Sequence, residues 1–131
     1  MRAIRVLIVD DNNDFAKAAG GFLDAIPAVE VIGYAGSGME ALAMITQLRP
    51  TLVLMDLLMP GMDGLEAARQ IKCCSAAPKV VIVSMLDPET YDTAAHWAGA
   101  DGFVSKKTFA AQLQPLLEAL FHTGEGLNIA H

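Results

Sequence analysis

Three aspartates stand where short apolar runs of this sequence stop. Asp10 and Asp11 follow the run Ile4–Val9, and Asp56 follows the apolar run 52–55. Each run has the length and composition of a buried β-strand. If the strands are parallel, all three carboxylates lie at one edge of the sheet and repel one another, which favours a bound cation. Oxygen ligands of this kind select a hard ion, so we expect Mg²⁺, with the backbone carbonyl of Leu58 as a further ligand.

Two other polar side chains end later apolar runs. Ser84 follows the run 80–83, and Lys106 comes shortly after the pair 103–104. A carboxylate held by a metal and a lysine is suited to accept a phosphoryl group, because this reaction needs positioning and charge neutralisation. We therefore expect Asp56 to be the nucleophile, Lys106 to contact the phosphoryl oxygens, and Ser84 to donate a hydrogen bond to them.

Each of these residues has an ordinary alternative when it is taken alone. Asp10 or Asp11 could cap a helix, Asp56 could belong to a turn, and Lys106 could be a solvated surface lysine. The coincidence at four strand ends favours the shared site. Asp63, by contrast, is expected to cap a helix rather than to bind metal. Other helix caps are expected at Asn12 or Asn13, at Ser37 and at Thr108.

The pattern of apolar residues predicts five strands that alternate with five helices. Strands are expected at Ile4–Val9, Val29–Ala35, 51–55, 80–83 and 103–104, and helices at 13–26, 38–48, 65–74, 88–97 and 108–120. Phe15, Ala19, Phe22 and Ile26 should form the inner face of the first helix. Pro115 should kink the last helix or delay its start. Alternation of this kind predicts an α/β fold with a doubly wound parallel sheet, of flavodoxin-like (βα)5 type with strand order 2-1-3-4-5.

Composition narrows the classes of function. The chain has 131 residues, enough for one domain, and a net charge of −6 that disfavours direct binding of nucleic acid. The apolar run near the N-terminus is too short for a signal peptide, and no run is long enough to cross a membrane. The two cysteines, Cys73 and Cys74, are adjacent and are expected to be free thiols. These features predict a cytoplasmic protein.

The site residues and their surroundings resemble the receiver domain of two-component response regulators, the CheY-like superfamily. The resemblance covers about residues 4–120 and includes the acidic pair after the first strand and the loop 55–64 around Asp56. It also includes Ser84 as the switch hydroxyl, Phe103 as the switch aromatic and Lys106 as the family's lysine. We expect a receiver domain over residues 1–122, followed by a tail or the start of a linker over 123–131.

The resemblance implies a function and partners. A sensor histidine kinase would donate its phosphoryl group to Asp56 in the presence of Mg²⁺, and self-phosphorylation by small donors and self-dephosphorylation would also occur. The modified state would change the surface formed by the fourth helix, the fifth strand and the fifth helix, and this surface could form a homodimer. Slow loss of the phosphoryl group is expected because Leu58 and Leu86 are apolar.

One departure from the common family pattern points to a subfamily. Many members carry proline after the lysine, whereas this chain has Lys107, which is similar to receivers of NarL/FixJ regulators that precede a LuxR-type DNA-binding domain. No such domain follows His131 in this sequence. We therefore expect either a receiver taken from a longer transcription regulator, which the tail favours slightly, or a stand-alone receiver.

Three other functions compete with this interpretation. A phosphatase of the haloacid-dehalogenase type would need its nucleophile on the first strand and an acid two positions later, where this chain has Leu58 after Asp56. A flavodoxin-like FMN protein would need a phosphate-binding loop rich in Ser and Thr after the first strand, where Asp10 and Asp11 would instead repel the phosphate. A degenerate receiver, acting only as a protein-interaction module, would lack phosphorylation altogether.

Overall fold

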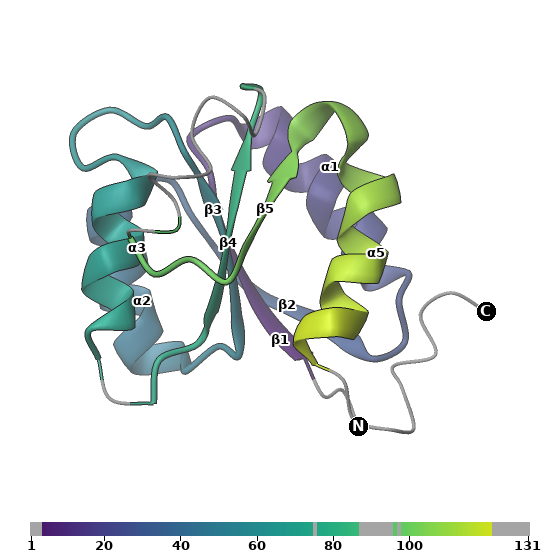
Figure 1. The fold of residues 1–131 in the computed structure, drawn as a ribbon, viewed down its shortest axis with the longest axis horizontal. Helices are drawn as coiled ribbons and strands as arrows, with labels where there is room; N and C mark the ends of the chain where they lie inside the picture. The colour runs from purple at the N-terminus through teal and green to yellow at the C-terminus, as the bar shows by residue number, and fades with distance from the viewer. Residues whose placement is uncertain (1–3, 75, 87–95, 97, 122–131) are drawn as a thin grey trace.

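The computed structural model describes residues 4–74, 76–86, 96 and 98–121 as a parallel five-stranded sheet with helices on both faces (Figure 1). The strand order is β2-β1-β3-β4-β5, as predicted. The strands are β1 (Ile4–Val9), β2 (Val29–Ala35), β3 (Leu52–Asp56), β4 (Lys79–Ser84) and β5 (Gly102–Ser105). The helices are α1 (Asn13–Asp24), α2 (Gly38–Leu48), α3 (Gly64–Lys72) and α5 (Phe109–Leu120), and a 3-10 turn (Lys106–Thr108) precedes α5. The helix predicted at 88–97 lies outside the described residues, apart from His96.

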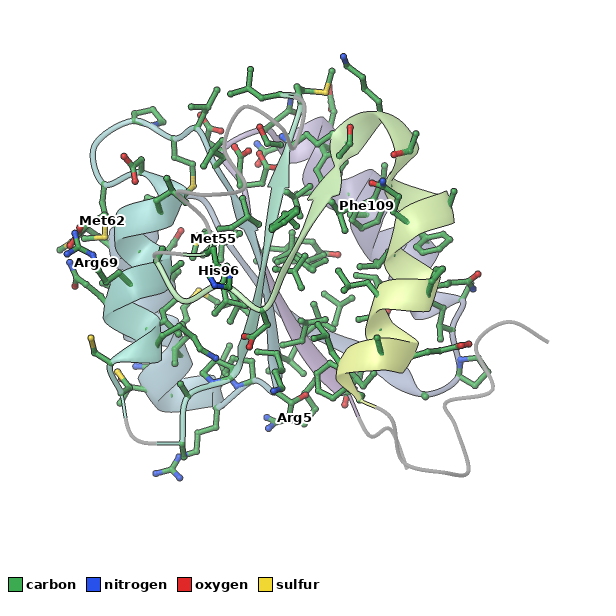
Figure 2. The ribbon with its side chains drawn as sticks, in the orientation of Figure 1. Arg5, Met55, Met62, Arg69, His96 and Phe109 are labelled. Carbon is green, nitrogen blue, oxygen red and sulfur yellow. The ribbon has the colours of Figure 1, made fainter. Side chains whose placement is uncertain are left out.

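Alternating side chains divide the core into two layers, because successive residues of a strand point to opposite faces of the sheet. One layer lies under α1 and α5, and the other lies under α2 and α3 (Figure 1). Figure 2 shows Met55 of β3 on the side of α3, and Phe109 on the side of α1. The central strands β1 and β3 contribute to both layers. They are therefore held firmly at the ends that carry the acidic residues.

The buried residues of α1 overlap in part with the predicted inner face. They are Ala16, Ala19, Gly20 and Leu23. Phe15 and Phe22 are only half-buried and lie beside the Phe109 ring, with centroids 5.3 and 5.8 Å away. The predicted face is therefore confirmed at Ala19 and Ile26, which are buried, and Phe15 and Phe22 pack against the same core layer as partly buried residues.

The other helix signals are largely confirmed. Asn12 caps α1, Ser37 caps α2 and Asp63 caps α3, each by accepting a hydrogen bond from a backbone N–H three residues later. The last helix begins at Phe109, so Pro115 does not delay its start. Thr108 precedes α5 without a side-chain capping bond.

The described part of the chain contains no helix long and apolar enough to cross a membrane. Cys73 and Cys74, at the end of α3, are exposed free thiols, as predicted.

Candidate functional site

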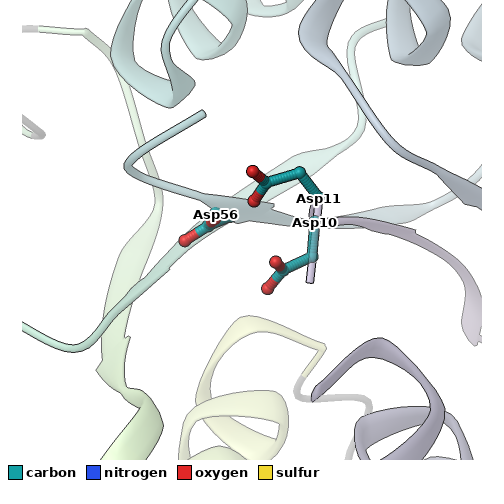
Figure 3. A group of neighbouring side chains, drawn as sticks. All are labelled: Asp10, Asp11 and Asp56. Carbon is teal, nitrogen blue, oxygen red and sulfur yellow. The ribbon is translucent and has the colours of Figure 1, made fainter. Parts of the chain in front are cut away.

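Three carboxylates meet where β1 and β3 end, as the sequence predicts (Figure 3). Asp10 follows β1 directly, Asp56 is the last residue of β3, and these two strands pair side by side. One carboxylate oxygen from each of Asp10, Asp11 and Asp56 lies within 4.8 Å of the others. Asp10 and Asp56 are buried, whereas Asp11 is exposed. The three side chains therefore form a pocket in which two carboxylates are buried and the third, that of Asp11, is open to solvent.

Lys106 is the cation of this pocket. Its Nζ lies 2.8 Å from Oδ2 of Asp10 and 3.5 Å from Oδ1 of Asp56. The same ammonium lies 4.6 Å from the centre of the Phe15 ring, a cation–π distance. The lysine is thus bonded mainly to Asp10 and stands beside Asp56.

Both oxygens of Asp10 are engaged by the surrounding fold. Oδ2 meets Lys106, and Oδ1 accepts a hydrogen bond of 2.8 Å from the backbone N–H of Asn12. The side chain of Asn12 in turn caps α1 by accepting from the N–H of Phe15, at 3.0 Å. The cap of α1 and the acidic pocket are therefore built by one continuous set of bonds.

The pKa of Asp56 is raised from 3.8 to about 6 in the absence of metal. Burial is the main cause, repulsion by Asp10 adds to it, and the ammonium of Lys106 compensates only in part. Asp56 is therefore still mostly ionised at neutral pH. The ammonium of Lys106 lies closer to Asp10 than to Asp56, so it compensates the charge of Asp56 only in part.

The donor set of the pocket suits a hard divalent cation. All three side chains offer oxygen, and three carboxylates face a single ammonium, so two negative charges remain when all are ionised. Leu58 follows β3 by two residues in an exposed loop, and its carbonyl as a fourth ligand stays a prediction. A metal here would relieve the repulsion that raises the pKa of Asp56.

Ser84 lies at the end of β4, next to β3, and is almost fully buried. Its Oγ accepts a hydrogen bond of 3.0 Å from the backbone N–H of Leu86. A hydroxyl that accepts through its oxygen can still donate its proton. The position at the strand end agrees with the sequence prediction, and the switching role stays a prediction.

Phe103, the predicted switch aromatic, lies on β5 and is half-buried against the core layer under α2 and α3. Its β-sheet partner is Ile82 of β4, two residues before Ser84. The aromatic ring and the hydroxyl are therefore carried by adjacent strands.

Sequence reasoning missed the part that Gly64 plays in shaping the loop after Asp56. A Cβ added to Gly64 would lie 2.1 Å from the backbone oxygen of Asp56, which leaves no room for a side chain. The N–H of Gly64 also donates to the carbonyl of Leu57, at 2.9 Å. Only the spacing of Gly64 from Asp56, within a loop already rich in turn residues, could have suggested this close approach.

Comparisons with known proteins all point to one family. Residues 6–118 match the response regulator receiver domain. Over 118 residues the chain is 36% identical to the transcriptional regulatory protein LiaR of Bacillus subtilis, covering 88% of this chain and 55% of LiaR. The chain thus spans about half the length of that relative.

Solved structures agree with this match. The receiver domain of the putative response regulator NarL from Mycobacterium tuberculosis has a TM-score of 0.82 at 28% identity, over 93% of this chain and 96% of that one. The receiver domain of the histidine kinase CKI1 from Arabidopsis thaliana, complexed with Mg²⁺, has a TM-score of 0.79 at 30% identity, over 92% and 93%.

Proposed function

This chain belongs to the response regulator receiver family, and we propose that it accepts a phosphoryl group on Asp56 from the phosphohistidine of a sensor histidine kinase. The observation that carries the proposal is the lysine that lies between two buried carboxylates of a three-carboxylate pocket. The match to two-component relatives supports the same conclusion. The predicted cytoplasmic location follows from this function and stays a prediction.

The reaction is a transfer between two nucleophiles. A carboxylate oxygen of Asp56 forms a bond to phosphorus, the bond from phosphorus to the histidine nitrogen breaks, and that nitrogen takes up a proton. Asp56 must be ionised to attack, and a pKa of about 6 leaves it mostly so at neutral pH. Asp56 is the last residue of β3, so its carboxylate lies at the edge of the sheet from which a donor would approach.

The remaining residues stabilise the group once it is bound. Lys106, 3.5 Å from Asp56, is placed to contact the phosphoryl oxygens, and Ser84 can donate its hydroxyl proton to them. Asp10, Asp11, Asp56 and the carbonyl of Leu58 would hold Mg²⁺. When bound, this ion would neutralise part of the charge on the carboxylates and on the phosphoryl oxygens.

We further propose that phosphorylation changes the surface formed by the segment 87–97, β5 and α5. The phosphoryl group adds nearly two negative charges beside Ser84. Movement of Ser84 towards it would open space for Phe103 on the neighbouring strand. Identical amide chemical shifts for β5 and α5, with and without a beryllofluoride mimic of the phosphoryl group, would contradict this proposal.

The expected output is control of transcription through a DNA-binding domain that the present sequence does not include. The similarity to LiaR and to the NarL receiver supports this output. Residues 123–131 would then begin the linker to that domain. A similar receiver domain also occurs in the histidine kinase CKI1.

The first test measures the intact mass of the protein after incubation with Mg²⁺ and acetyl phosphate. We expect one phosphoryl adduct on the wild type, and no adduct with EDTA or for Asp56→Asn. The matched control is Asp63→Asn, which changes the aspartate that caps α3 and keeps a capping side chain. That variant should be labelled like the wild type.

A wild type that stays unlabelled, while it is folded and binds Mg²⁺, would contradict the proposed function. The chain would then be a degenerate receiver that acts only through protein contacts.

A further inference from the structure

The turn that follows β5 carries Lys106, and its backbone is hydrogen-bonded to the side chains of Ser105 and Gln112. β5 is an edge strand of the sheet, so one side of it has no neighbouring strand among the described residues. The backbone N–H of Ser105, its last residue, donates to Oε1 of Gln112 on α5 at 2.9 Å. The amide of Gln112 therefore takes the place of a strand partner, directly before Lys106.

A second bond fixes the other side of the lysine. The backbone N–H of Lys107 donates to Oγ of Ser105 at 3.1 Å, which caps the 3-10 turn. This bond needs a backbone N–H at position 107, and a proline there would have none. Lys106 is thus enclosed between two residues whose backbone N–H groups are both bonded to side chains.

We propose that Ser105 and Gln112 are positioning residues that hold the turn after β5 so that the ammonium of Lys106 bridges Asp10 and Asp56. This inference rests on the proposed function for its effect on phosphoryl transfer.

The geometry of the ammonium explains why the turn has to be fixed. Lys106 has a long, flexible side chain, and its Nζ lies 2.8 Å from Asp10 but 3.5 Å from Asp56. Asp10 alone could hold the ammonium away from Asp56 if the backbone shifted. A fixed backbone limits the positions that the ammonium can reach, which favours the bridging arrangement.

Burial also argues against an incidental contact for Ser105. Ser105 is buried, and its Oγ is the side-chain cap of the turn. Gln112, in contrast, is exposed on α5 apart from its bond to Ser105. A change of Gln112 should therefore leave the core intact, which makes it the better residue to vary.

The test compares the rate at which acetyl phosphate labels Asp56 in four variants. Gln112→Met keeps the length of the side chain and removes the acceptor, and we expect labelling about fivefold slower, the effect of one lost hydrogen bond. Ser105→Ala should act in the same direction. Gln112→Glu keeps an acceptor oxygen and should restore most of the rate. Gln47→Met, at an exposed position of α2, is the matched control and should label like the wild type.

Combination with Lys106→Ala separates positioning from a general loss of structure. If Gln112 acts through the lysine, Gln112→Met should cause no further slowing when Lys106 is already absent. A slowing of the same factor in both backgrounds would overturn the inference, and so would a wild-type rate for Gln112→Met.

A readout that needs no phosphoryl transfer distinguishes this inference from the proposed function. The ¹H–¹⁵N signal of the Lys106 ammonium, assigned by its loss in Lys106→Ala, should be visible in the wild type and in Gln112→Glu because the group is paired and protected from solvent exchange. It should broaden or disappear in Gln112→Met. An unchanged signal would overturn the positioning role, whereas a wild type that is never labelled would overturn only the proposed function.

Discussion

At the scale of the residue, Asp56 is the group whose ionisation conflicts most with its surroundings. Burial and Asp10 raise its pKa from 3.8 to about 6 in the metal-free protein. Between these two values the folded state binds more protons than the unfolded state. The free energy of unfolding should therefore fall as the pH rises from about 4 to about 6, and stay low above that range.

Asp56→Asn removes this charge, so we expect the variant to be more stable than the wild type in EDTA at neutral pH. The difference should reach up to about 3 kcal/mol, because raising a pKa by one corresponds to about 1.4 kcal/mol. It should vanish below about pH 4, where the carboxyl is protonated in both the folded and the unfolded state. Urea unfolding of both proteins at each pH measures it. Equal stability of the two proteins across the whole pH range would contradict the prediction that ionised Asp56 destabilises the metal-free protein.

The lifetime of the phosphoryl group is the second prediction at this scale. Leu58 and Leu86 lie in the loops that follow Asp56 and Ser84, and both are exposed. Apolar side chains there cannot hydrogen-bond to an attacking water, so loss of the phosphoryl group should be slow. Leu58→Asn should shorten the lifetime several-fold, as followed by intact mass after removal of the donor. Met39→Asn, a change of an exposed residue on α2, should leave the lifetime unchanged.

At the scale of the element, the contact between α3 and β3 gives the sharpest prediction. Gly64→Ala would place a Cβ against the backbone oxygen of Asp56, so the first turn of α3 or the loop must move. We expect a loss of about 1–3 kcal/mol in the free energy of unfolding, together with slower labelling of Asp56.

The matched control is Gly21→Ala in the interior of α1, where an added Cβ has no neighbour within 4 Å. This change should stabilise the protein by about 0.5–1 kcal/mol, because alanine favours the helix. Destabilisation of the same size in both variants would show that the loss belongs to helical glycines in general and not to the contact with Asp56.

The helices also show which features of the fold can be predicted from sequence patterns. Capping signals located the starts of α1, α2 and α3, because a cap depends on residues only three positions apart. The predicted face of α1 is confirmed at Ala19 and Ile26. Periodicity alone does not reveal whether a side chain on that face meets the sheet or a neighbouring helix. The rings of Phe15 and Phe22 pack on Phe109, which is far away in sequence.

At the scale of the whole molecule, the strand order follows from the sequence, and this order accounts for the meeting of the carboxylates. Parallel strands place their ends at one edge, so Asp10 and Asp56 had to be neighbours once β1 and β3 were. The bonds of Gln112 and Gly64 were not predictable in this way. Each depends on atomic contacts between two elements, and the periodicity of apolar residues gives no information on such contacts.

Self-association is the prediction that belongs to the whole molecule. If phosphorylation changes the surface formed by the segment 87–97, β5 and α5, the protein should pass from a monomer of 13.9 kDa towards a dimer when acetyl phosphate and Mg²⁺ are present. Light scattering after size-exclusion chromatography measures this change, with Asp56→Asn as the control. A phosphorylated protein that remains monomeric at high micromolar concentration would show that this domain alone does not dimerise.

The position of Cys73 and Cys74 has a practical consequence. α3 starts beside Asp56 and ends at Lys72, so the two exposed thiols lie at the far end of a nine-residue helix about 13 Å long. Because the chain has no other cysteine, a fluorophore attached after Cys73→Ser would sit at Cys74 alone. Such a label would let binding of a kinase or of a second copy be followed by anisotropy in real time, without a substitution near the carboxylates.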